Sequence, residues 1–292
     1  MNGVINVFKN TGMTSFDVVR RIKKIAKTGK VGHTGTLDPE ASGVLPICIG
    51  RATKIIDYIM DSDKVYEVEF KLGLKTTTYD LEGEVVDRRD TSNLTEEEII
   101  TVVKSFVGEY SQVPPMYSAL KQNGVRLYEL ARKGIEVERE GRLINIKSIE
   151  DIQVNNPIVK MKVTCTKGTY IRSLCFDIGE KLEVFAVMTK LKRSKTSKFS
   201  EEEAINIEDL TEDNINDYLI SIEEALNSFD KITINNNYSK LLINGVNVYD
   251  KRLTRDKTII NKLYRVYDED NNFIGLGKND GKGFKIEKLL IN

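Results

Sequence analysis

One carboxylate lies in a glycine-rich loop, where it could act as a nucleophile or as a general base. It is Asp38, within the run Gly32-His33-Thr34-Gly35-Thr36-Leu37-Asp38-Pro39. Gly32 and Gly35 allow backbone conformations that other residues avoid, and they let a ligand approach the main chain closely. The ring of Pro39 fixes its own φ and restricts Asp38. A carboxylate held in this way suits covalent or acid–base chemistry, although the same pattern is also typical of a structural turn.

The remaining residue types argue against several other kinds of site. The chain has one histidine, His33, so a histidine-rich zinc site is not expected. A Ser-His-Asp relay is not expected either, unless His33 serves it. Cys48, Cys165 and Cys175 lie among apolar or β-branched neighbours without metal-ligand spacing, which indicates reduced structural thiols. The loop around Asp38 also lacks the Lys-Ser/Thr ending of a nucleotide-binding loop.

The net charge of zero conceals a separation of charge along the chain. Residues 201–230 hold eleven acidic and no basic residues, so the rest has 44 basic and 44 − 11 = 33 acidic residues. Affinity for RNA depends on local positive surface rather than on total charge. Neutrality therefore does not exclude a nucleic-acid partner. We predict that the acidic stretch is a solvated helix and linker.

The elements expected around the loop would hold it against a sheet. A strand at 3–8 precedes a helix capped by Thr14 or Ser15, and a buried strand is expected at 44–49. Residues 64–72 alternate with period two, as in a strand with one wet face. Further strands are predicted at 85–86, 143–154 and 158–166, helices at 52–60, 94–106, 127–132 and 170–182, and an ordered loop at 110–125. Because strands and helices do not alternate strictly, we expect an α+β core with a mixed, mainly antiparallel sheet.

The chain of 292 residues has room for one large domain and a small appendage. We place the large domain at 1–230 and a small β-rich domain at 231–292, with short strands near 262–267, 272–277 and 283–290. No apolar run is long enough to span a bilayer, and the N-terminal residues lack the pattern of a secretory signal. We therefore expect a cytoplasmic protein. Nothing in the sequence indicates an obligate dimer, and we expect a monomer.

A family resemblance extends the interpretation of the Asp38 loop. Residues 31–46 (VGHTGTLDPEASGVLP) resemble the active-site motif of the TruB family of tRNA pseudouridine synthases. Four further segments agree with that family in order, namely 61–66 (DSDKVY), 114–121 (PPMYSALK), 128–134 (YELARKG) and 167–174 (KGTYIRSL). The similarity spans about residues 3–195, and the tail resembles the family's small PUA-like RNA-contacting domain more weakly.

The resemblance implies an activity and three catalytic residues. The family isomerises uridine 55 in the T-loop of tRNA to pseudouridine without a cofactor or a metal, so the T-arm of tRNA is the implied partner. The target base must leave the RNA stack before it can react. Asp38 matches the family's essential aspartate. Tyr66 matches the tyrosine that stacks on the flipped base, and Arg172 matches the arginine paired with the aspartate.

Other residues match positions that contact the RNA. His33 matches the histidine that helps to displace the flipped nucleotide, while Tyr170 and Leu191 match positions that line the uridine site. About residues 110–140 match an RNA-gripping insertion. We also predict a phosphate-binding surface made of lysines and an arginine, namely Lys192, Arg193, Lys195 and Lys198 with Lys23, Lys24, Lys27 and Lys30.

Two departures from the family pattern and two alternative functions remain. Asn10 replaces the proline of a usual Lys-Pro pair, which predicts a looser turn beneath the loop. Thr77 replaces an aspartate, but Asp80 matches a later acid of that segment and could keep a polar link. One alternative function is an RNA-binding folding chaperone. The other is a glycoside hydrolase, which needs a second acid roughly 5 to 9.5 Å from Asp38.

Overall fold

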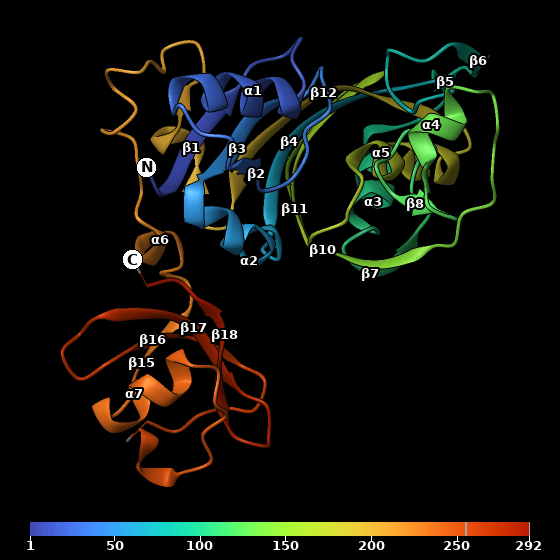
Figure 1. Ribbon diagram of the computed structural model, residues 1–292. Coiled ribbons are helices and arrows are strands. Elements are labelled where there is room, and N and C mark those ends of the chain that lie inside the picture. Colours follow the sequence, from blue (N-terminus) through green and yellow to red (C-terminus); the bar gives the residue numbers. More distant parts are fainter. Residues whose placement is uncertain (255, 292) are drawn as a thin grey trace.

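The computed structural model describes residues 1–254 and 256–291, which form two separate main sheets (Figure 1). The larger is a ten-stranded mixed sheet in which β13 pairs with β12, β2 pairs with β3, and the remaining order is β14-β1-β3-β12-β4-β11-β10-β7. Its strands are β1 (Gly3–Lys9), β2 (Val31–His33), β3 (Ser42–Ile49), β4 (Lys64–Leu72), β7 (Gly108–Gln112), β10 (Arg142–Asn155), β11 (Ile158–Cys165), β12 (Ala186–Thr196), β13 (Phe199–Ser200) and β14 (Ile205–Asn206). Most neighbours are antiparallel, which confirms the predicted α+β class.

Helices and two small hairpins surround this sheet. The helices are α1 (Ser15–Ile25), α2 (Ile56–Met60), α3 (Glu96–Lys104), α4 (Leu127–Ala131), α5 (Ile171–Lys181) and α6 (Ile222–Ala225), whereas α7 (Asn236–Ile243) belongs to the smaller unit (Figure 1). The hairpins pair β5 (Leu74–Thr76) with β6 (Val85–Arg88), and β8 (Lys121–Gln122) with β9 (Val125–Arg126). Thr14 and Thr95 cap α1 and α3 through capping boxes. Across the described ranges, no helix is long and apolar enough to cross a membrane.

The strand that joins the two halves of the large sheet was not predicted. β12 lies between β3, to which it is parallel, and β4, to which it is antiparallel. Its sequence, AVMTKLKRSKT, carries basic residues at both faces, so it does not alternate as a half-buried strand should. The register nevertheless places Leu191 and Arg193 on the inward face. We predicted a basic surface that includes Lys192, Arg193, Lys195 and Lys198. Because β12 lies in the middle of the sheet, Arg193 is buried and does not form part of a free surface.

The acidic stretch is not the solvated linker that we predicted. β14 pairs in parallel with β1, and Ile220 bridges to Val4 on the same strand. Ile207, Leu210 and Ile215 are buried in the main core. Apolar residues spaced through the segment therefore attach it to the edge of the large sheet, while its carboxylates remain outside.

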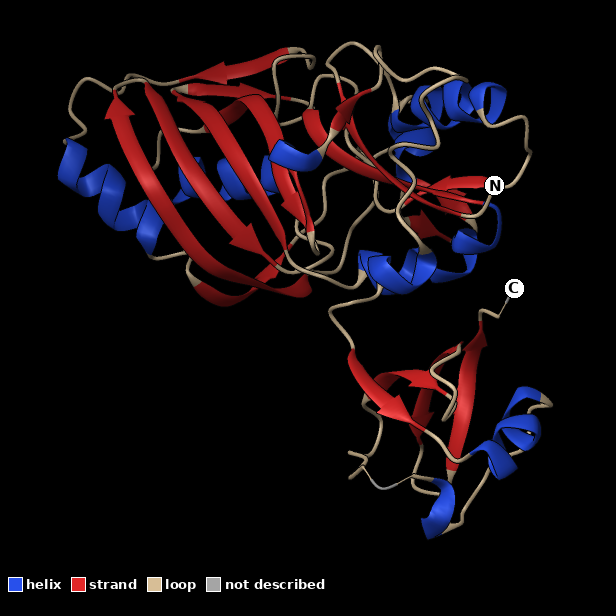
Figure 2. Ribbon diagram, turned by 90° about the vertical axis from the view of Figure 1, so that its left-hand side faces the viewer, coloured by secondary structure: helices blue, strands red, loops and turns tan. Residues whose placement is uncertain are grey.

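The second sheet is a four-stranded unit with the order β15-β16-β17-β18 (Figure 2). Its strands are β15 (Asp230–Thr233), β16 (Leu263–Tyr267), β17 (Phe273–Asn279) and β18 (Phe284–Leu289), and three of them were predicted. Helix α7 was not predicted. Leu276 and Leu290 pack in one apolar cluster with Val44 and Ile55 of the larger part, and Arg51 donates to the Ile291 carbonyl at 2.6 Å. The two parts therefore share a small apolar contact.

Candidate active site

The loop that carries Asp38 is fastened to the neighbouring elements on both sides. It connects β2 with β3. The Ser15 hydroxyl at the start of α1 accepts from the Leu37 amide at 2.9 Å and donates to the Leu37 carbonyl at 3.1 Å. The Thr34 hydroxyl donates to the Pro46 carbonyl at 3.2 Å. These bonds are buried, so they fix the main chain on either side of Asp38.

Two glycines of this loop are required by its geometry. Gly35 and Gly43 have φ values of 126° and 114°, which L residues with side chains rarely adopt. A Cβ on Gly43 would also lie 2.3 Å from the Arg193 carbonyl oxygen on the adjacent strand. The loop therefore starts and closes where only glycine is free of strain, as the sequence pattern predicted in part.

A buried lysine supports the Asp38 loop through hydrogen bonds to main-chain carbonyls. Lys9 is 0% exposed, and its ammonium donates to the carbonyls of Asn10, Met13 and Pro39 at 2.9, 2.7 and 3.1 Å. Burial lowers the pKa of Lys9 to about 8, although the charges of Glu40 and Asp38 oppose this shift. Asn10, where a proline was expected, exchanges side-chain hydrogen bonds with Asn206. The turn without proline is thus held by Lys9 and by an amide pair.

We predict that Lys9→Met lowers the free energy of unfolding by about 2 kcal/mol, because three main-chain carbonyls lose their bond to the buried ammonium. Urea denaturation of the variant and of wild type measures this difference. Lys54→Met is the matched control, since Lys54 donates to the Leu289 carbonyl from an exposed position. A Lys9→Met variant as stable as wild type would show that Lys9 does not support the loop.

Asp38 and Arg172 form a two-contact ion pair. The Arg172 Nε lies 2.9 Å from Asp38 Oδ2, and its Nη2 donates to Asp38 Oδ1 at 3.2 Å. The side chain of Arg172 is 7% exposed, whereas that of Asp38 is 37% exposed. The same guanidinium donates to the carbonyls of Thr78 and Tyr117 at 3.2 and 2.9 Å. Arg172 therefore orients a carboxylate that stays open to a ligand.

Asp80 completes the surroundings of Arg172. Its Oδ2 lies 3.7 Å from the Arg172 Nη1, and its Oδ1 accepts from the Thr78 hydroxyl and from the Glu82 amide. The polar link that we expected from Asp80 is therefore present despite Thr77. Since Asp80 is engaged on both oxygens, it is not a free second carboxylate beside Asp38.

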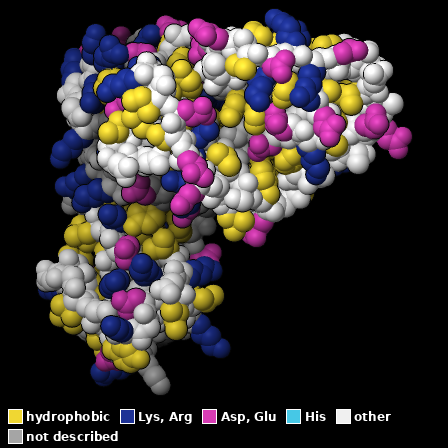
Figure 3. Space-filling model, turned by 90° about the vertical axis from the view of Figure 1, so that its right-hand side faces the viewer, with side chains coloured by type: hydrophobic (Ala, Val, Ile, Leu, Met, Phe, Trp, Pro, Cys, Tyr) yellow, Lys and Arg dark blue, Asp and Glu magenta, His cyan; other side chains and the backbone are white. Residues whose placement is uncertain are grey.

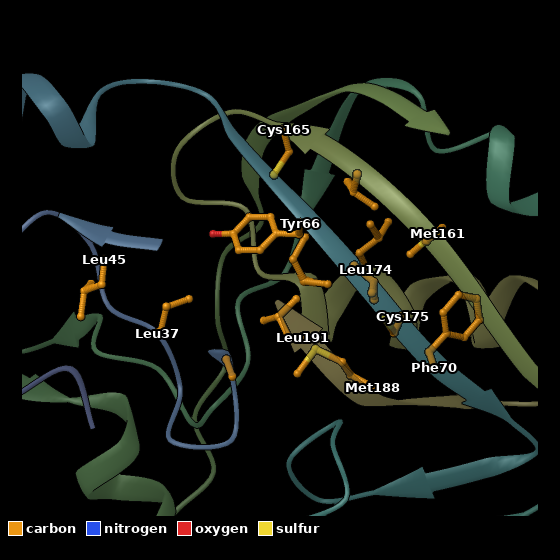
Figure 4. Packing of buried hydrophobic residues seen from close by; sticks show 14 of the residues in the cluster. Leu37, Leu45, Tyr66, Phe70, Met161, Cys165, Leu174, Cys175, Met188 and Leu191 are labelled. Carbon is orange, nitrogen blue, oxygen red and sulfur yellow. The ribbon is translucent and has the colours of Figure 1, made fainter. Parts of the chain in front are cut away.

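Tyr66 and Leu191 lie on the face of the sheet next to the loop. Tyr66 extends from β4 and is 8% exposed, and Leu191 on β12 is 9% exposed. Both belong to the same apolar cluster as Leu37. In Figure 4 the Tyr66 hydroxyl points towards the side on which Leu37 and Leu45 lie. Burial raises the pKa of Tyr66, while the charge of Arg193 opposes that rise.

Tyr170 and His33 are both half-buried. Tyr170 precedes α5, and its amide and carbonyl both pair with the side chain of Gln112 at 2.8 and 3.1 Å. The His33 Nδ1 accepts from the Gly35 amide at 3.3 Å. Burial and the charge of Arg193 lower the pKa of His33, so its imidazole is neutral at pH 7. Gln112, which is 1% exposed on β7, is a support that the sequence did not reveal, because we read that segment as a loop.

The predicted phosphate surface needs correction at Arg193. We expected this residue on the surface, but it is 1% exposed and donates to the carbonyls of Val44 and Gly35. The reason is its place on the central strand β12. Lys192 lies partly exposed beside it and pairs with Glu67 and Glu201 at 3.1 and 2.8 Å.

The acidic stretch also neutralises part of the predicted surface. Lys27 pairs with Glu212 at 2.6 Å, and Lys198 with Glu224 at 3.5 Å. Lys24, Lys30 and Lys195 are exposed, and each lacks an ion-pair partner among the described residues. Lysine and arginine side chains gather along the left margin of the larger part in Figure 3. A smaller basic surface than predicted therefore remains.

Family models match most of the chain. The model described as "TruB family pseudouridylate synthase (N terminal domain)" matches residues 23–171. The model described as "tRNA pseudouridylate synthase B C-terminal domain" matches residues 172–229. A tRNA pseudouridine synthase B from Clostridium perfringens (strain SM101 / Type A) is 64% identical over 292 residues, covering 100% of this chain and 99% of that protein. One from Clostridium tetani (strain Massachusetts / E88) is 58% identical over 291 residues, covering 100% of both.

Solved structures agree on the fold. A chain in a Cbf5-Nop10-Gar1 complex superposes with a TM-score of 0.76 at 28% identity, covering 98% of this chain and 84% of that chain. A chain in an H/ACA RNP bound to a substrate RNA containing 2'-deoxyuridine has a TM-score of 0.73 at 26% identity, covering 99% of this chain and 85% of that one. The chain belongs to the TruB family of pseudouridylate synthases and is an enzyme that isomerises uridine in tRNA to pseudouridine.

Proposed function

We propose that this enzyme isomerises uridine 55 in the T-loop of tRNA and that Asp38 is its essential catalytic carboxylate. The observation that carries this proposal is the pairing of Asp38 with Arg172 by two contacts, at 2.9 and 3.2 Å, in a loop whose Leu37 packs in the same apolar cluster as the buried Tyr66. Arg172 holds the Asp38 carboxylate at a fixed orientation, and Asp38 remains open to a ligand. Release of tritium from tRNA labelled at uracil C5 tests the activity directly, because C5 loses its hydrogen in the reaction.

The chemistry needs no outside reagent. The N1–C1′ bond breaks, the uracil turns, and a C5–C1′ bond forms; the proton lost from C5 is balanced by the proton gained at N1. Product and substrate have the same atoms and the same oxidation state, so we propose that no cofactor takes part. Asp38 can either attack the nucleotide covalently or remove a sugar proton to give a glycal.

The side chains around Asp38 suit a base that has left the RNA stack. We propose that Tyr66 stacks on the flipped uracil and that Leu191 and Tyr170 line its other sides, since aromatic and apolar surfaces hold extruded bases. The neutral imidazole of His33 would then contact the nucleotide at the loop entrance. Lys192, partly exposed between two glutamates, would contact RNA at the rim.

The remaining chain would grip the T-arm. We propose that about residues 110–140 form an RNA-gripping insertion and that 231–292 form a small PUA-like RNA-binding domain beside the catalytic domain at 1–230. The four-stranded sheet and its contact with the larger part support this division. Because one chain supplies all the proposed site residues, we propose that it acts as a monomer, and the tRNA substrate favours a cytoplasmic location.

Binding of tRNA is expected to weaken steeply with salt. If about five phosphates are contacted, the logarithm of the association constant falls against the logarithm of salt concentration with a slope of about −4. Filter binding at salt concentrations from about 50 to about 300 mM measures this slope. Replacing Lys24 and Lys195 by Gln should make the slope shallower by about 1 to 2. Lys27→Gln should change the slope less, because the Lys27 ammonium of wild type is paired with Glu212. A slope near zero would argue against this surface.

Membership of the TruB family of pseudouridylate synthases argues against the glycoside hydrolase alternative. That mechanism needs a second carboxyl group to act as a general acid. Asp80 is the acid that shares Arg172 with Asp38, but its oxygens are engaged by Thr78, Glu82 and Arg172. A role in tRNA folding is compatible with isomerisation and is separated from it by the Asp38 variant considered below.

A further inference from the structure

Arg193 is a buried cation without a carboxylate partner. It is 1% exposed, and within residues 1–254 and 256–291 no carboxylate oxygen lies within 4.0 Å of its nitrogens. Burying an unpaired charge costs several kcal/mol, so such groups are uncommon outside functional sites. Its burial argues against a surface contact with phosphate. A different role must account for it.

The strand register places Arg193 directly beside Tyr66. On β12 it is the cross-strand partner of Tyr66 on β4, and on its other side it is the partner of Gly43 on β3. Side chains at opposed positions of neighbouring strands stand on one face, with Cβ atoms roughly 5 Å apart. The positive charge is the strongest influence that opposes the effect of burial on the Tyr66 hydroxyl. The guanidinium and the phenol therefore act on each other in the folded protein.

The same guanidinium also fastens the loop that carries Asp38. Its Nε donates to the Val44 carbonyl at 2.8 Å, and its Nη2 donates to the Gly35 carbonyl at 3.2 Å. Gly35 precedes Asp38 by three residues, and Val44 follows it by six. One side chain thus connects both ends of the loop with β12, the strand that pairs with β4 at Tyr66.

We propose that Arg193 is a positioning residue, which fixes the Tyr66 hydroxyl relative to the Asp38 loop so that both act on the same uridine. This inference rests on the proposed function for its catalytic consequence. The contact between Arg193 and Tyr66 does not depend on that function. The two can therefore be tested separately.

The contact is tested by a double-mutant cycle in unfolding. The four proteins are wild type, Arg193→Met, Tyr66→Phe and the double variant, and urea denaturation gives each unfolding equilibrium constant. We expect the two substitutions to be coupled by at least tenfold in that constant, which is about 1.4 kcal/mol. Additive effects would overturn the inference, whatever the enzyme catalyses.

The catalytic consequence is tested by single-turnover tritium release with enzyme in excess over tRNA. We expect Arg193→Met to slow the reaction by about 30-fold while the dissociation constant for tRNA changes less than about threefold. Arg193→Lys should restore part of the rate, because it returns the charge without the fork of donors. Arg89→Met is the matched control, since Arg89 also donates to a carbonyl, that of Glu183, from an exposed position.

The outcomes distinguish the contact between Arg193 and Tyr66 from its catalytic consequence. If wild type releases no tritium, the proposed function fails, and the unfolding cycle still decides the contact. If wild type is active but Arg193→Met mainly weakens tRNA binding and flattens its salt dependence, Arg193 contacts phosphate and the inference is wrong. An unchanged rate in Arg193→Met would also contradict it.

Discussion

Asp38→Asn is expected to reduce tritium release from C5-labelled tRNA by at least about three orders of magnitude. The substitution keeps the size of the side chain and one acceptor for Arg172, but it removes the carboxylate that we propose attacks the nucleotide or takes a proton. Binding should stay within about tenfold of wild type, which corresponds to about 1.4 kcal/mol, because the phosphate contacts lie elsewhere. Single-turnover assays and filter binding measure the two quantities.

Glu40→Gln is the matched control for this prediction. Glu40 is an exposed acid two residues from Asp38, and it is not expected to change the rate. A rate near that of wild type in Asp38→Asn would remove Asp38 from the mechanism. Folding of tRNA by Asp38→Asn should be assayed as well. If folding remains normal while isomerisation is lost, the enzyme has both activities.

The second large effect is expected from Arg172→Met. The buried guanidinium binds Asp38, Asp80 and two main-chain carbonyls, so its loss releases the Asp38 carboxylate and leaves the carbonyls without this donor. We expect tritium release to fall by about 10²- to 10³-fold. We also expect the free energy of unfolding to fall by about 2 kcal/mol, which is less than for a fully buried pair because Asp38 is partly exposed.

Arg172→Lys should rescue less than a tenth of the lost rate. A single ammonium cannot reproduce two parallel contacts with Asp38 together with the bonds to Thr78 and Tyr117. Lys181→Met, at the other end of α5, is the control, since its ammonium binds the Ser105 hydroxyl far from Asp38 along the helix. Full activity in Arg172→Lys would mean that charge alone matters and that the geometry of the pair does not.

The sequence predicted the parts of the site that depend on local rules. The expected backbone freedom is used at Gly35, which has a positive φ, but not at Gly32, which lies in β2. The capping residues Thr14 and Thr95 mark helices that the structure contains. The alternation at 64–72 predicted β4, although it did not show that Tyr66 lies on the buried face. These features arise from backbone preferences and side-chain period, which are visible within a few residues.

The parts that were missed depend on contacts between distant segments. Arg193 looks like a surface cation because its neighbours are basic, and only the pairing of β12 with β3 and β4 buries it. Lys9 looks like the end of a strand, and its three carbonyl acceptors come from the turn and from the Asp38 loop. The acidic stretch has the composition of a solvated helix and linker because its charges dominate, although Ile207 and Ile215 are buried in the core. In each case, contacts with distant segments bury residues that the local composition alone would place on the surface.

The central claim is tested most directly by mapping pseudouridine at single-nucleotide resolution in unmodified tRNA incubated with the purified protein. The account predicts one new pseudouridine, at position 55 in the T-loop, with wild type and none with Asp38→Asn. Pseudouridine at another position only, or the same product from Asp38→Asn, would contradict it.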